Sequence, residues 1–338
     1  MRVLILSRRD VLAALTPEGC AGAMAEVLTA QARGETCLPL RSLMVPPGAA
    51  GFMGLMPSWR GAHGGRGDGS AAFALKALCL MPGNSARGLD MHQGTVTLFD
   101  GETGVPTAIL DASAVTAVRT AAVTAVATGL LARHGARTLA ILGAGVQGRA
   151  HLRALTTVRR FERIRVYAPT QAHASALIEQ AIAADSEPGA ELSIAPSAEE
   201  AVRDADVVVT ATSAREPVLA HSWLKPGAHV NAVGASTPAA REIDTATVAA
   251  SALFCDSRES LRHEAGEFQL AIAEGAITGE EHVRAELGEV LAGTAPGRRD
   301  DNELTLFRSL GIAIEDLAAA QTAVAAARAQ GLGTEVEL

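Results

Sequence analysis

The 338-residue sequence predicts an α/β protein that combines a doubly wound parallel sheet with a second domain of mixed helices and strands. From residue 138 onward, short runs of Val, Ile, Leu and Ala alternate with helix-compatible stretches, which is the pattern of a parallel sheet with helices on both faces. The first such run, residues 139–142, leads directly into three closely spaced glycines. The first third instead carries strand-like segments joined at residues 100–104 by a strong hairpin signal, Asp-Gly-Glu-Thr-Gly.

The composition is that of a folded protein whose cores are built from aliphatic side chains. Hydrophobic residues make up 48% of the chain, charged residues 20% and aromatic residues 3%. The net charge is −8 and no Lys/Arg tract stands out, which argues against nucleic acid as the main partner. The sequence shows no run of about 18 apolar residues and no signal-peptide core, so we expect no membrane span and a cytoplasmic location. The four cysteines lack metal-like or redox-like spacing, so we expect no metal.

In the first third, apolar spacing predicts one helix, several strands and a Gly-rich loop. The helix is expected over residues 9–33 and the loop over residues 59–70. Strands are expected at 36–45, 51–57, 73–81, 95–99 and 106–110.

From residue 112 the pattern changes to Ala-rich helices and a strand–helix alternation. A long helix is expected over 112–133, short helices over 258–292, and a final helix over 304–330. Strands are expected at 138–142, 163–168, 206–211, 228–233 and 252–255. The helices between them are expected at 147–158, 171–184, 197–203 and 245–250.

The glycines at Gly143, Gly145 and Gly148 follow a strand and open a helix, which is the context of the dinucleotide-binding fingerprint in a Rossmann fold. Gly143 permits the tight turn, Gly145 the close approach of a pyrophosphate, and Gly148 the close packing of helix on strand. The first helical residues, Val146 and Gln147, add unpaired N–H groups and the positive end of the helix dipole. We therefore predict that a nucleotide binds here.

Three basic residues stand in otherwise apolar surroundings. Arg41 follows Leu-Pro-Leu, Lys76 lies inside the expected strand 73–81, and Arg119 interrupts the helix expected over 112–133. A charge in such a position is rarely buried without a partner. Paired cations would suit a substrate carboxylate, although side chains that reach solvent from half-buried elements explain the same pattern.

Several motifs, in order along nearly the whole chain, resemble the ornithine cyclodeaminase/mu-crystallin family. They are Leu139-Ala-Ile-Leu-Gly-Ala-Gly-Val-Gln-Gly148 and the segments 99–104, 110–122, 223–234, 285–291 and 303–311. The resemblance implies that residues 1–118 with 304–338 form a substrate-binding and dimerisation domain, and that residues 119–303 form the NAD(P)-binding Rossmann domain. It also implies a homodimer, and that Arg41, Lys76 and Arg119 hold the carboxylate of a small amino or imino acid.

Two positions depart from the ornithine cyclodeaminase pattern. That branch of the family carries an acidic pair where this sequence has Ser236 and Gly54. Without those carboxylates the bases for deprotonating an ammonium group are missing, which disfavours cyclodeaminase and alanine dehydrogenase chemistry. The segment 235–244 and the tripeptide that begins at His92 look more like the mu-crystallin and imine-reductase branch.

The predicted activity is therefore the NAD(P)H-dependent reduction of a cyclic imine or ketimine amino acid, such as 1-pyrroline-2-carboxylate. The proton would come from Lys76, as a desolvated lysine, from His92, interpreted as a loop histidine, or from a water. An amino-acid cyclodeaminase that releases ammonia, an alanine-dehydrogenase-like enzyme and a non-catalytic dimeric cofactor-binding protein remain as alternatives.

The segment after the second Rossmann strand favours NADP(H), while NAD(H) stays open. An acid roughly 20 residues past the glycines would hold the ribose of NAD, and residues 165–171 contain none. Thr170, Gln171 and His173 could instead hydrogen-bond a 2′-phosphate, and Arg149 is a further basic candidate. The other expected cofactor contacts are Thr120, Thr210, Ala211, Thr212, Val233 and Gly234.

Overall fold

The computed structural model describes residues 2–62, 69–183 and 189–337, and these residues form two compact units. The first unit consists of Met1–Arg119 and Gly311–Leu338, and the second of Thr120–Leu310. The second unit is thus inserted between the two segments that build the first. Half of the expected Gly-rich loop, residues 63–68, lies outside the described part of the chain.

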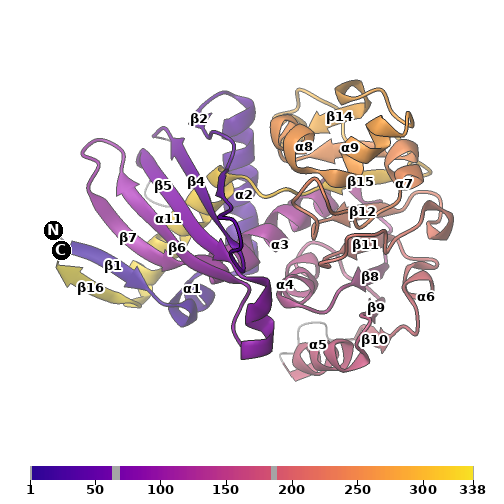
Figure 1. Cartoon of the computed structure of the whole chain (residues 1–338), viewed down its shortest axis with the longest axis horizontal. Coiled ribbons are helices and arrows are strands. Elements are labelled where there is room, and N and C mark those ends of the chain that lie inside the picture. Colours follow the sequence, from indigo (N-terminus) through magenta and orange to yellow (C-terminus); the bar gives the residue numbers. More distant parts are fainter. Residues whose placement is uncertain (1, 63–68, 184–188, 338) are drawn as a thin grey trace. The chain divides into compact units, whose positions relative to one another are not determined.

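The first unit is built on a mixed sheet in the order β16-β1-β7-β6-β5-β4-β2, with β3 paired to β4 (Figure 1). The strand β1 is parallel to β7, and the other neighbours are antiparallel. The strands are β1 (Arg2–Leu6), β2 (Thr36–Cys37), β3 (Ser42–Met44), β4 (Phe52–Arg60), β5 (Ala72–Leu80), β6 (His92–Asp100), β7 (Pro106–Asp111) and β16 (Thr334–Glu337). The expected hairpin is confirmed, because β6 and β7 are joined at residues 101–105.

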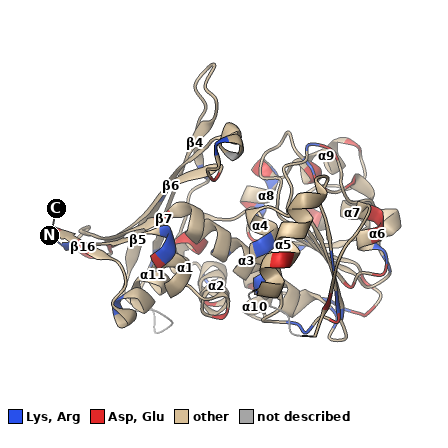
Figure 2. Cartoon of the chain, turned by 90° about the horizontal axis from the view of Figure 1, so that it is seen from below, with Lys and Arg blue, Asp and Glu red and all other residues tan. Residues whose placement is uncertain are grey.

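Three helices lie on one face of this sheet: α1 (Arg8–Ala14), α2 (Pro17–Ala32) and α11 (Ala313–Gln330) (Figure 2). The helix α11 packs on β4, β5 and β6, and α2 packs on α11. The single helix expected over 9–33 was wrong. The chain leaves the helical conformation at Leu15 and Thr16 and bends by 80° before α2. The Thr16 side chain caps α2, and Pro17, which has no N–H to leave unpaired, starts it.

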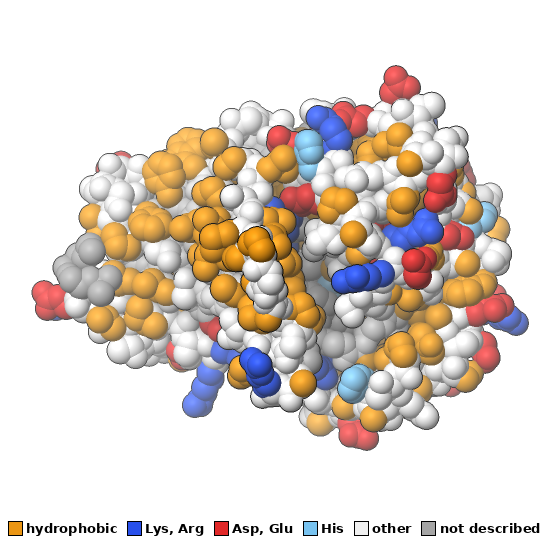
Figure 3. Space-filling model, viewed as in Figure 1, with side chains coloured by type: hydrophobic (Ala, Val, Ile, Leu, Met, Phe, Trp, Pro, Cys, Tyr) orange, Lys and Arg blue, Asp and Glu red, His pale blue; other side chains and the backbone are white. Residues whose placement is uncertain are grey.

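The opposite face of the first sheet carries exposed apolar side chains, and none of the helices α1, α2 and α11 lies on it. Leu55 on β4 and Phe73 on β5 expose 37% and 46% of their surface. Figure 3 shows hydrophobic side chains gathered over these strands. Contiguous apolar surface of this kind is typical of a protein–protein interface.

The second unit is built on an all-parallel sheet in the order β10-β9-β8-β11-β12-β15-β13-β14, which confirms the doubly wound Rossmann prediction. Its strands are β8 (Thr138–Leu142), β9 (Arg163–Tyr167), β10 (Glu191–Ile194), β11 (Val207–Thr210), β12 (His229–Ala232), β13 (Ala252–Cys255), β14 (Val283–Glu286) and β15 (Thr305–Arg308). Its principal helices are α4 (Val146–Leu155), α5 (Gln171–Ala183), α6 (Ala198–Val202), α7 (Thr245–Ala250), α8 (Arg258–Glu264), α9 (Gly266–Ala273) and α10 (Leu287–Leu291).

Helices cover both faces of this second sheet and bury two separate apolar clusters. Side chains of α4 and α5 pack into one cluster, and those of α6, α7 and α9 into the other. Two strands, β10 and β14, were not expected. The helix expected from residue 304 was also wrong, because residues 305–308 form β15 between β12 and β13 and the helix begins only at Ala313.

The long helix α3 (Ala112–Leu131) is apolar on nearly all sides. By length and composition it could cross a bilayer, with a mean hydropathy of 1.5 over its best window, but 78% of that window is buried inside the protein. Among the described residues no other unbroken helix passes the same test, while the bent pair α1–α2 passes only if it is counted as one span. Burial of this extent is what the core helix of a globular domain shows.

Two histidines are fully buried in the second unit. His151 lies within hydrogen-bond distance of the Gln147 carbonyl and the Thr124 hydroxyl, and His229 lies equally close to Thr305 and Asn231. Burial lowers the pKa of His151 to about 4 and that of His229 to about 3. Both imidazoles are therefore neutral at physiological pH.

Candidate functional site

The three cations singled out from the sequence all lie in the first unit. Lys76 sits in the middle of β5 on the face covered by α11, and Arg119 lies in the first half of α3. They expose only 1% and 4% of their surface. Arg41 precedes β3 and is half-buried. Lys76 and Arg119 are therefore buried cations and do not extend their charged groups into solvent.

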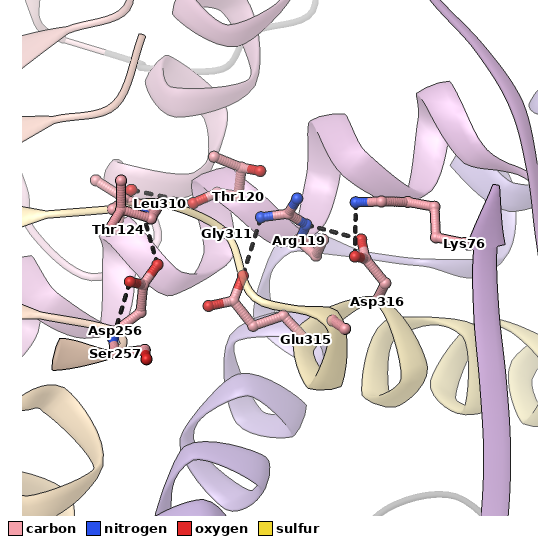
Figure 4. Close-up of polar contacts among 12 residues, drawn as sticks. Lys76, Arg119, Thr120, Thr124, Asp256, Ser257, Leu310, Gly311, Glu315 and Asp316 are labelled. Atoms are coloured by element: carbon pink, nitrogen blue, oxygen red, sulfur yellow. Dashed lines mark hydrogen bonds and ion pairs between the residues drawn. The ribbon is translucent and has the colours of Figure 1, made fainter. Parts of the chain in front are cut away.

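Two carboxylates from the start of α11 pair with these cations. Lys76 Nζ lies 2.6 Å from Asp316 Oδ2, and Arg119 Nε donates to Asp316 Oδ1 at 2.9 Å. Arg119 Nη1 donates to Glu315 Oε2, also at 2.9 Å. Figure 4 shows the Asp316 carboxylate between the ammonium and guanidinium groups. We call these five side chains (Arg41, Lys76, Arg119, Glu315 and Asp316) the charge cluster.

A glycine at the entrance to α11 makes room for the cluster. Gly311 has a φ of +72°, a conformation that L side chains rarely adopt, and a Cβ there would lie 2.3 Å from Arg119 Nη1. Its carbonyl accepts a hydrogen bond from Arg41 Nη2 at 2.9 Å. This turn therefore contacts both arginines at once.

Burial sets the protonation of the cluster. It lowers the pKa of Lys76 to about 8, against the opposing charge of Asp316. Burial alone would raise the pKa of Asp316, but the charges of Arg119 and Lys76 hold it below its ordinary value. At neutral pH the lysine is therefore cationic and the aspartate anionic, and the lysine releases its proton within reach of physiological pH.

His92 was expected in a loop, and that was wrong, because it begins β6 and pairs with Leu80. Paired residues on antiparallel strands point to the same side, so His92 and Lys76 share one face of the sheet. Burial, followed by the charges of Lys76 and Arg119, lowers the pKa of His92 to about 4. The imidazole is therefore neutral at physiological pH, which makes it a poor acid beside Lys76.

The glycine turn of the second unit has the geometry that the sequence predicts. Gly143 follows β8 with a φ of +110°, and a Cβ there would lie 2.3 Å from the Ala211 carbonyl oxygen. A Cβ at Gly148 would lie 2.0 Å from the Gly143 carbonyl oxygen. Gly145, the N-cap of α4, faces open space, and no side chain caps this helix. The N–H groups that begin α4, at Val146 and Gln147, thus border the open space at Gly145, which we call the cradle.

A buried glutamate joins the neighbouring strand ends at the same edge of this sheet. The Glu242 carboxylate accepts hydrogen bonds from the hydroxyls of Thr210 and Thr212 at 2.8 and 2.7 Å, and from the amides of Thr212 and Gly234 at 2.6 Å each. Val233 donates to the Thr210 carbonyl at 3.0 Å. Four of the expected cofactor contacts are thus linked at the ends of β11 and β12.

The remaining expected cofactor residues occupy separate places in the second unit. Thr170 lies between β9 and α5, and Gln171 and His173 stand in the first turn of α5. Thr120 is a buried residue of α3 whose carbonyl accepts a hydrogen bond from the Thr124 hydroxyl. No acidic residue lies between the end of β9 and the start of α5, as the sequence indicates.

The sequence reasoning missed the acidic half of the site. Glu315, Asp316 and Glu242 are buried and hold the expected residues in place. A signal was available, since Glu315 and Asp316 interrupt an Ala-rich helix just as Arg119 interrupts α3. A buried cation requires a partner of opposite charge, so a carboxylate in an apolar stretch is a candidate for that partner.

The sequence model described as the ornithine cyclodeaminase/mu-crystallin family matches residues 1–330. Ketimine reductase mu-crystallin of Mus musculus is 37% identical over 84% of this chain and 83% of its own length. The structure of Thermococcus litoralis Δ(1)-pyrroline-2-carboxylate reductase, in complex with NADH and L-proline, is 36% identical, covers 99% of this chain and 100% of its own, and gives a TM-score of 0.92. An archaeal alanine dehydrogenase dimer with bound NAD is 30% identical with full coverage of both chains and a TM-score of 0.90.

Proposed function

Since the chain belongs to the ornithine cyclodeaminase/mu-crystallin family, we propose that it is a nicotinamide-dependent reductase of cyclic imine or ketimine amino acids, with 1-pyrroline-2-carboxylate as the representative substrate. The observation that carries the proposal is the charge cluster. Three cations converge with two carboxylates, so these five side chains together keep one positive charge. Grouped Arg and Lys side chains suit the carboxylate of an imino acid.

The chain's own residues would divide the work as follows. Arg119 and Arg41 hold the substrate carboxylate and so fix the imine carbon in a reactive position. Lys76, whose pKa is about 8, donates a proton to the imine nitrogen. A nicotinamide cofactor, when bound, supplies the hydride. His92 has a pKa of about 4 and orients the substrate or a water as a neutral group.

The second unit would hold the cofactor on its glycine turn. Gly143 and Gly148 make close backbone contacts that a larger residue would break, while Gly145 leaves open the cradle at the start of α4. That combination fits a pyrophosphate at a helix N-terminus. Glu242 fixes the strand ends carrying Thr212 and Gly234 at the same edge of the sheet.

We place NADPH ahead of NADH as the preferred cofactor. No carboxylate follows β9 to accept the ribose hydroxyls of NADH, whereas Thr170, Gln171 and His173 offer donors there. The two related structures hold NADH and NAD, so both forms need testing. A lower KM for NADPH than for NADH is expected, and the reverse order would contradict this preference.

We also propose a homodimer formed through the uncovered face of the first sheet. The related alanine dehydrogenase is a dimer, and Phe73 and Leu55 leave an apolar surface that a second copy would cover. Phe73→Lys should shift the mass measured by light scattering from dimer to monomer. Ile182→Lys, at a position on α5 that is 64% exposed, is the control that should stay dimeric. A monomeric wild-type protein would refute the proposal.

The activity is tested by following NADPH and NADH oxidation by the purified protein with 1-pyrroline-2-carboxylate and 1-piperideine-2-carboxylate. Turnover is expected with at least one of these imines. Ammonia release from ornithine without added cofactor would instead identify a cyclodeaminase, despite Gly54 and Ser236. Tight cofactor binding without turnover on any amino or imino acid would identify a binding protein. The four cysteines are free thiols, which fits the cytoplasmic location that we propose.

A further inference from the structure

The acidic pair of α11 has a specific geometry relative to the cations. Asp316 contacts two of them with separate oxygens, Oδ2 toward Lys76 at 2.6 Å and Oδ1 toward Arg119 at 2.9 Å. Glu315 contacts a different nitrogen of Arg119, Nη1, at 2.9 Å (Figure 4). Asp316 exposes 1% of its surface and Glu315 none. The aspartate therefore joins the two buried cations that come from β5 and α3.

A carboxylate between two buried cations reduces the repulsion between them in an anion-binding site. A lysine and an arginine that act on one small substrate repel each other while the site is empty, and burial penalises both charges. A fixed carboxylate in contact with both cations offsets both costs. Removing it would let the two side chains separate, and it would make the buried lysine easier to deprotonate.

We propose that Asp316 is a positioning residue for imine reduction, which holds the Lys76 ammonium for the imine nitrogen and the Arg119 guanidinium for the carboxylate of the same substrate. Glu315 acts through its contact with Arg119. This inference rests on the proposed reductase function and adds to it the part of the site that α11 contributes. It assigns Asp316 no contact with the substrate.

The protonation of Lys76 gives a readout that a purely structural role would not move. The charged and titratable groups around it come from the elements packed against it: Asp316 and Glu315 on α11, Arg119 on α3, Arg41 ahead of β3, His92 on β6 and Cys20 on α2. Arg119 and Arg41 lower the pKa of Lys76, and Asp316 raises it. His92 is neutral, and burial keeps the Cys20 thiol protonated. Among these groups Asp316 therefore keeps the lysine cationic.

The experiment compares Asp316→Asn with Glu315→Gln, a neighbouring buried acid whose loss also costs one charge beside Arg119. The pH dependence of kcat/KM is measured with 1-pyrroline-2-carboxylate, and the binding of L-proline is measured by calorimetry. In Asp316→Asn we expect the basic limb of the profile to move to lower pH by at least about one unit, together with weaker proline binding. In Glu315→Gln we expect weaker proline binding with the basic limb unmoved.

Asp316→Glu keeps the charge but moves the carboxylate, and it is informative even if Asp316→Asn fails to fold. It should raise KM for the imine at least fivefold while leaving the basic limb near that of the wild type. An unchanged KM in Asp316→Glu, or an equal shift of the basic limb in Asp316→Asn and Glu315→Gln, would overturn the inference. A wild-type protein that reduces no imine would instead refute the proposed function, and proline binding by the same variants would still test the bridge.

Discussion

Gly311 and Arg119 are matched to each other, because a Cβ on Gly311 would lie 2.3 Å from the guanidinium nitrogen Nη1. The contact is at the far end of a flexible side chain, so a larger residue would displace the arginine before it disrupted the backbone around it. The absence of a side chain at Gly311 therefore allows the Arg119 guanidinium to occupy its position in the charge cluster.

Gly311→Ala should therefore weaken substrate binding more than it weakens the fold. The φ of +72° at this position destabilises the alanine variant by roughly 1–2 kcal/mol. Because the added Cβ also displaces Arg119, the KM for the imine should rise about tenfold or more. Gly331→Ala is the matched control, since Gly331 has a φ of +66° but nothing within 4 Å of an added Cβ. The melting temperature should be lower in both variants, whereas the KM for the imine should rise only in Gly311→Ala. Equal KM values would show that Gly311 serves the backbone alone.

Lys76→Met should abolish imine reduction without loss of cofactor binding. A general acid contributes about 10²–10⁴-fold to a rate, so kcat should fall by that order, while the fluorescence-measured Kd for NADPH changes less than about twofold. Lys225→Met, in the second unit, is the control that should retain turnover. Full activity in Lys76→Met would refute the role assigned to Lys76.

The wild-type rate should fall as pH rises through about 8. Lys76 is the proton donor and must be cationic. Because burial lowers its pKa to about 8, the enzyme with a protonated lysine predominates below that pH and is lost above it. The profile of kcat/KM between pH 6 and 10 tests this. A rate that stays flat across that range, or that rises above pH 8, would contradict the assignment.

Gly145→Ala should impair cofactor binding while leaving the fold intact. An added Cβ at this N-cap meets nothing within 4 Å in the protein, yet it would project into the cradle that begins α4. We expect Kd for NADPH to rise at least about tenfold, with an unchanged melting temperature. Gly135→Ala, also free of neighbours, should change neither quantity. A Kd like that of the wild type would mean that the cradle is not the phosphate site.

The protein should lose stability in mild acid because of its buried histidines. The pKa of His151 falls to about 4 and that of His229 to about 3 in the folded state, whereas the unfolded chain binds these protons near pH 6.5. The free energy of unfolding should therefore decrease as pH falls below about 6.5, by up to about 1.4 kcal/mol per pH unit for each histidine. Urea unfolding at pH 7, 6 and 5 measures this. Equal midpoints at the three values would contradict it.

The strands of the second sheet could be predicted because its residues are buried on both faces. Runs such as residues 138–142 and 252–255 then contain almost only apolar side chains, and their bounds were exact. The strand at residues 305–308, Thr-Leu-Phe-Arg, was missed because it holds only two apolar side chains and stands close before an Ala-rich helix, where periodicity alone does not separate strand from helix.

The chemistry of the site could be predicted only in part. Lys76 and Arg119 were found from their apolar surroundings, but the distance between them depends on strand register and helix packing, which one sequence does not specify. His92 was mistaken for a loop residue because the Gln-Gly that follows it interrupts the apolar alternation. The position of Asp316 in an Ala-rich helix marks it as a buried charge, but nothing local in the sequence identifies Lys76 on β5 as its partner.

The pairing of β16 with β1, together with the position of α11, makes the first unit the last to be completed during translation. The inserted second unit is synthesised in full before Glu315 and Asp316 are added to the chain. Until then the nascent chain carries Lys76 and Arg119 without the carboxylates that pair with them. A message truncated ahead of α11 would therefore yield a product able to form the nucleotide half but left with an incomplete charge cluster.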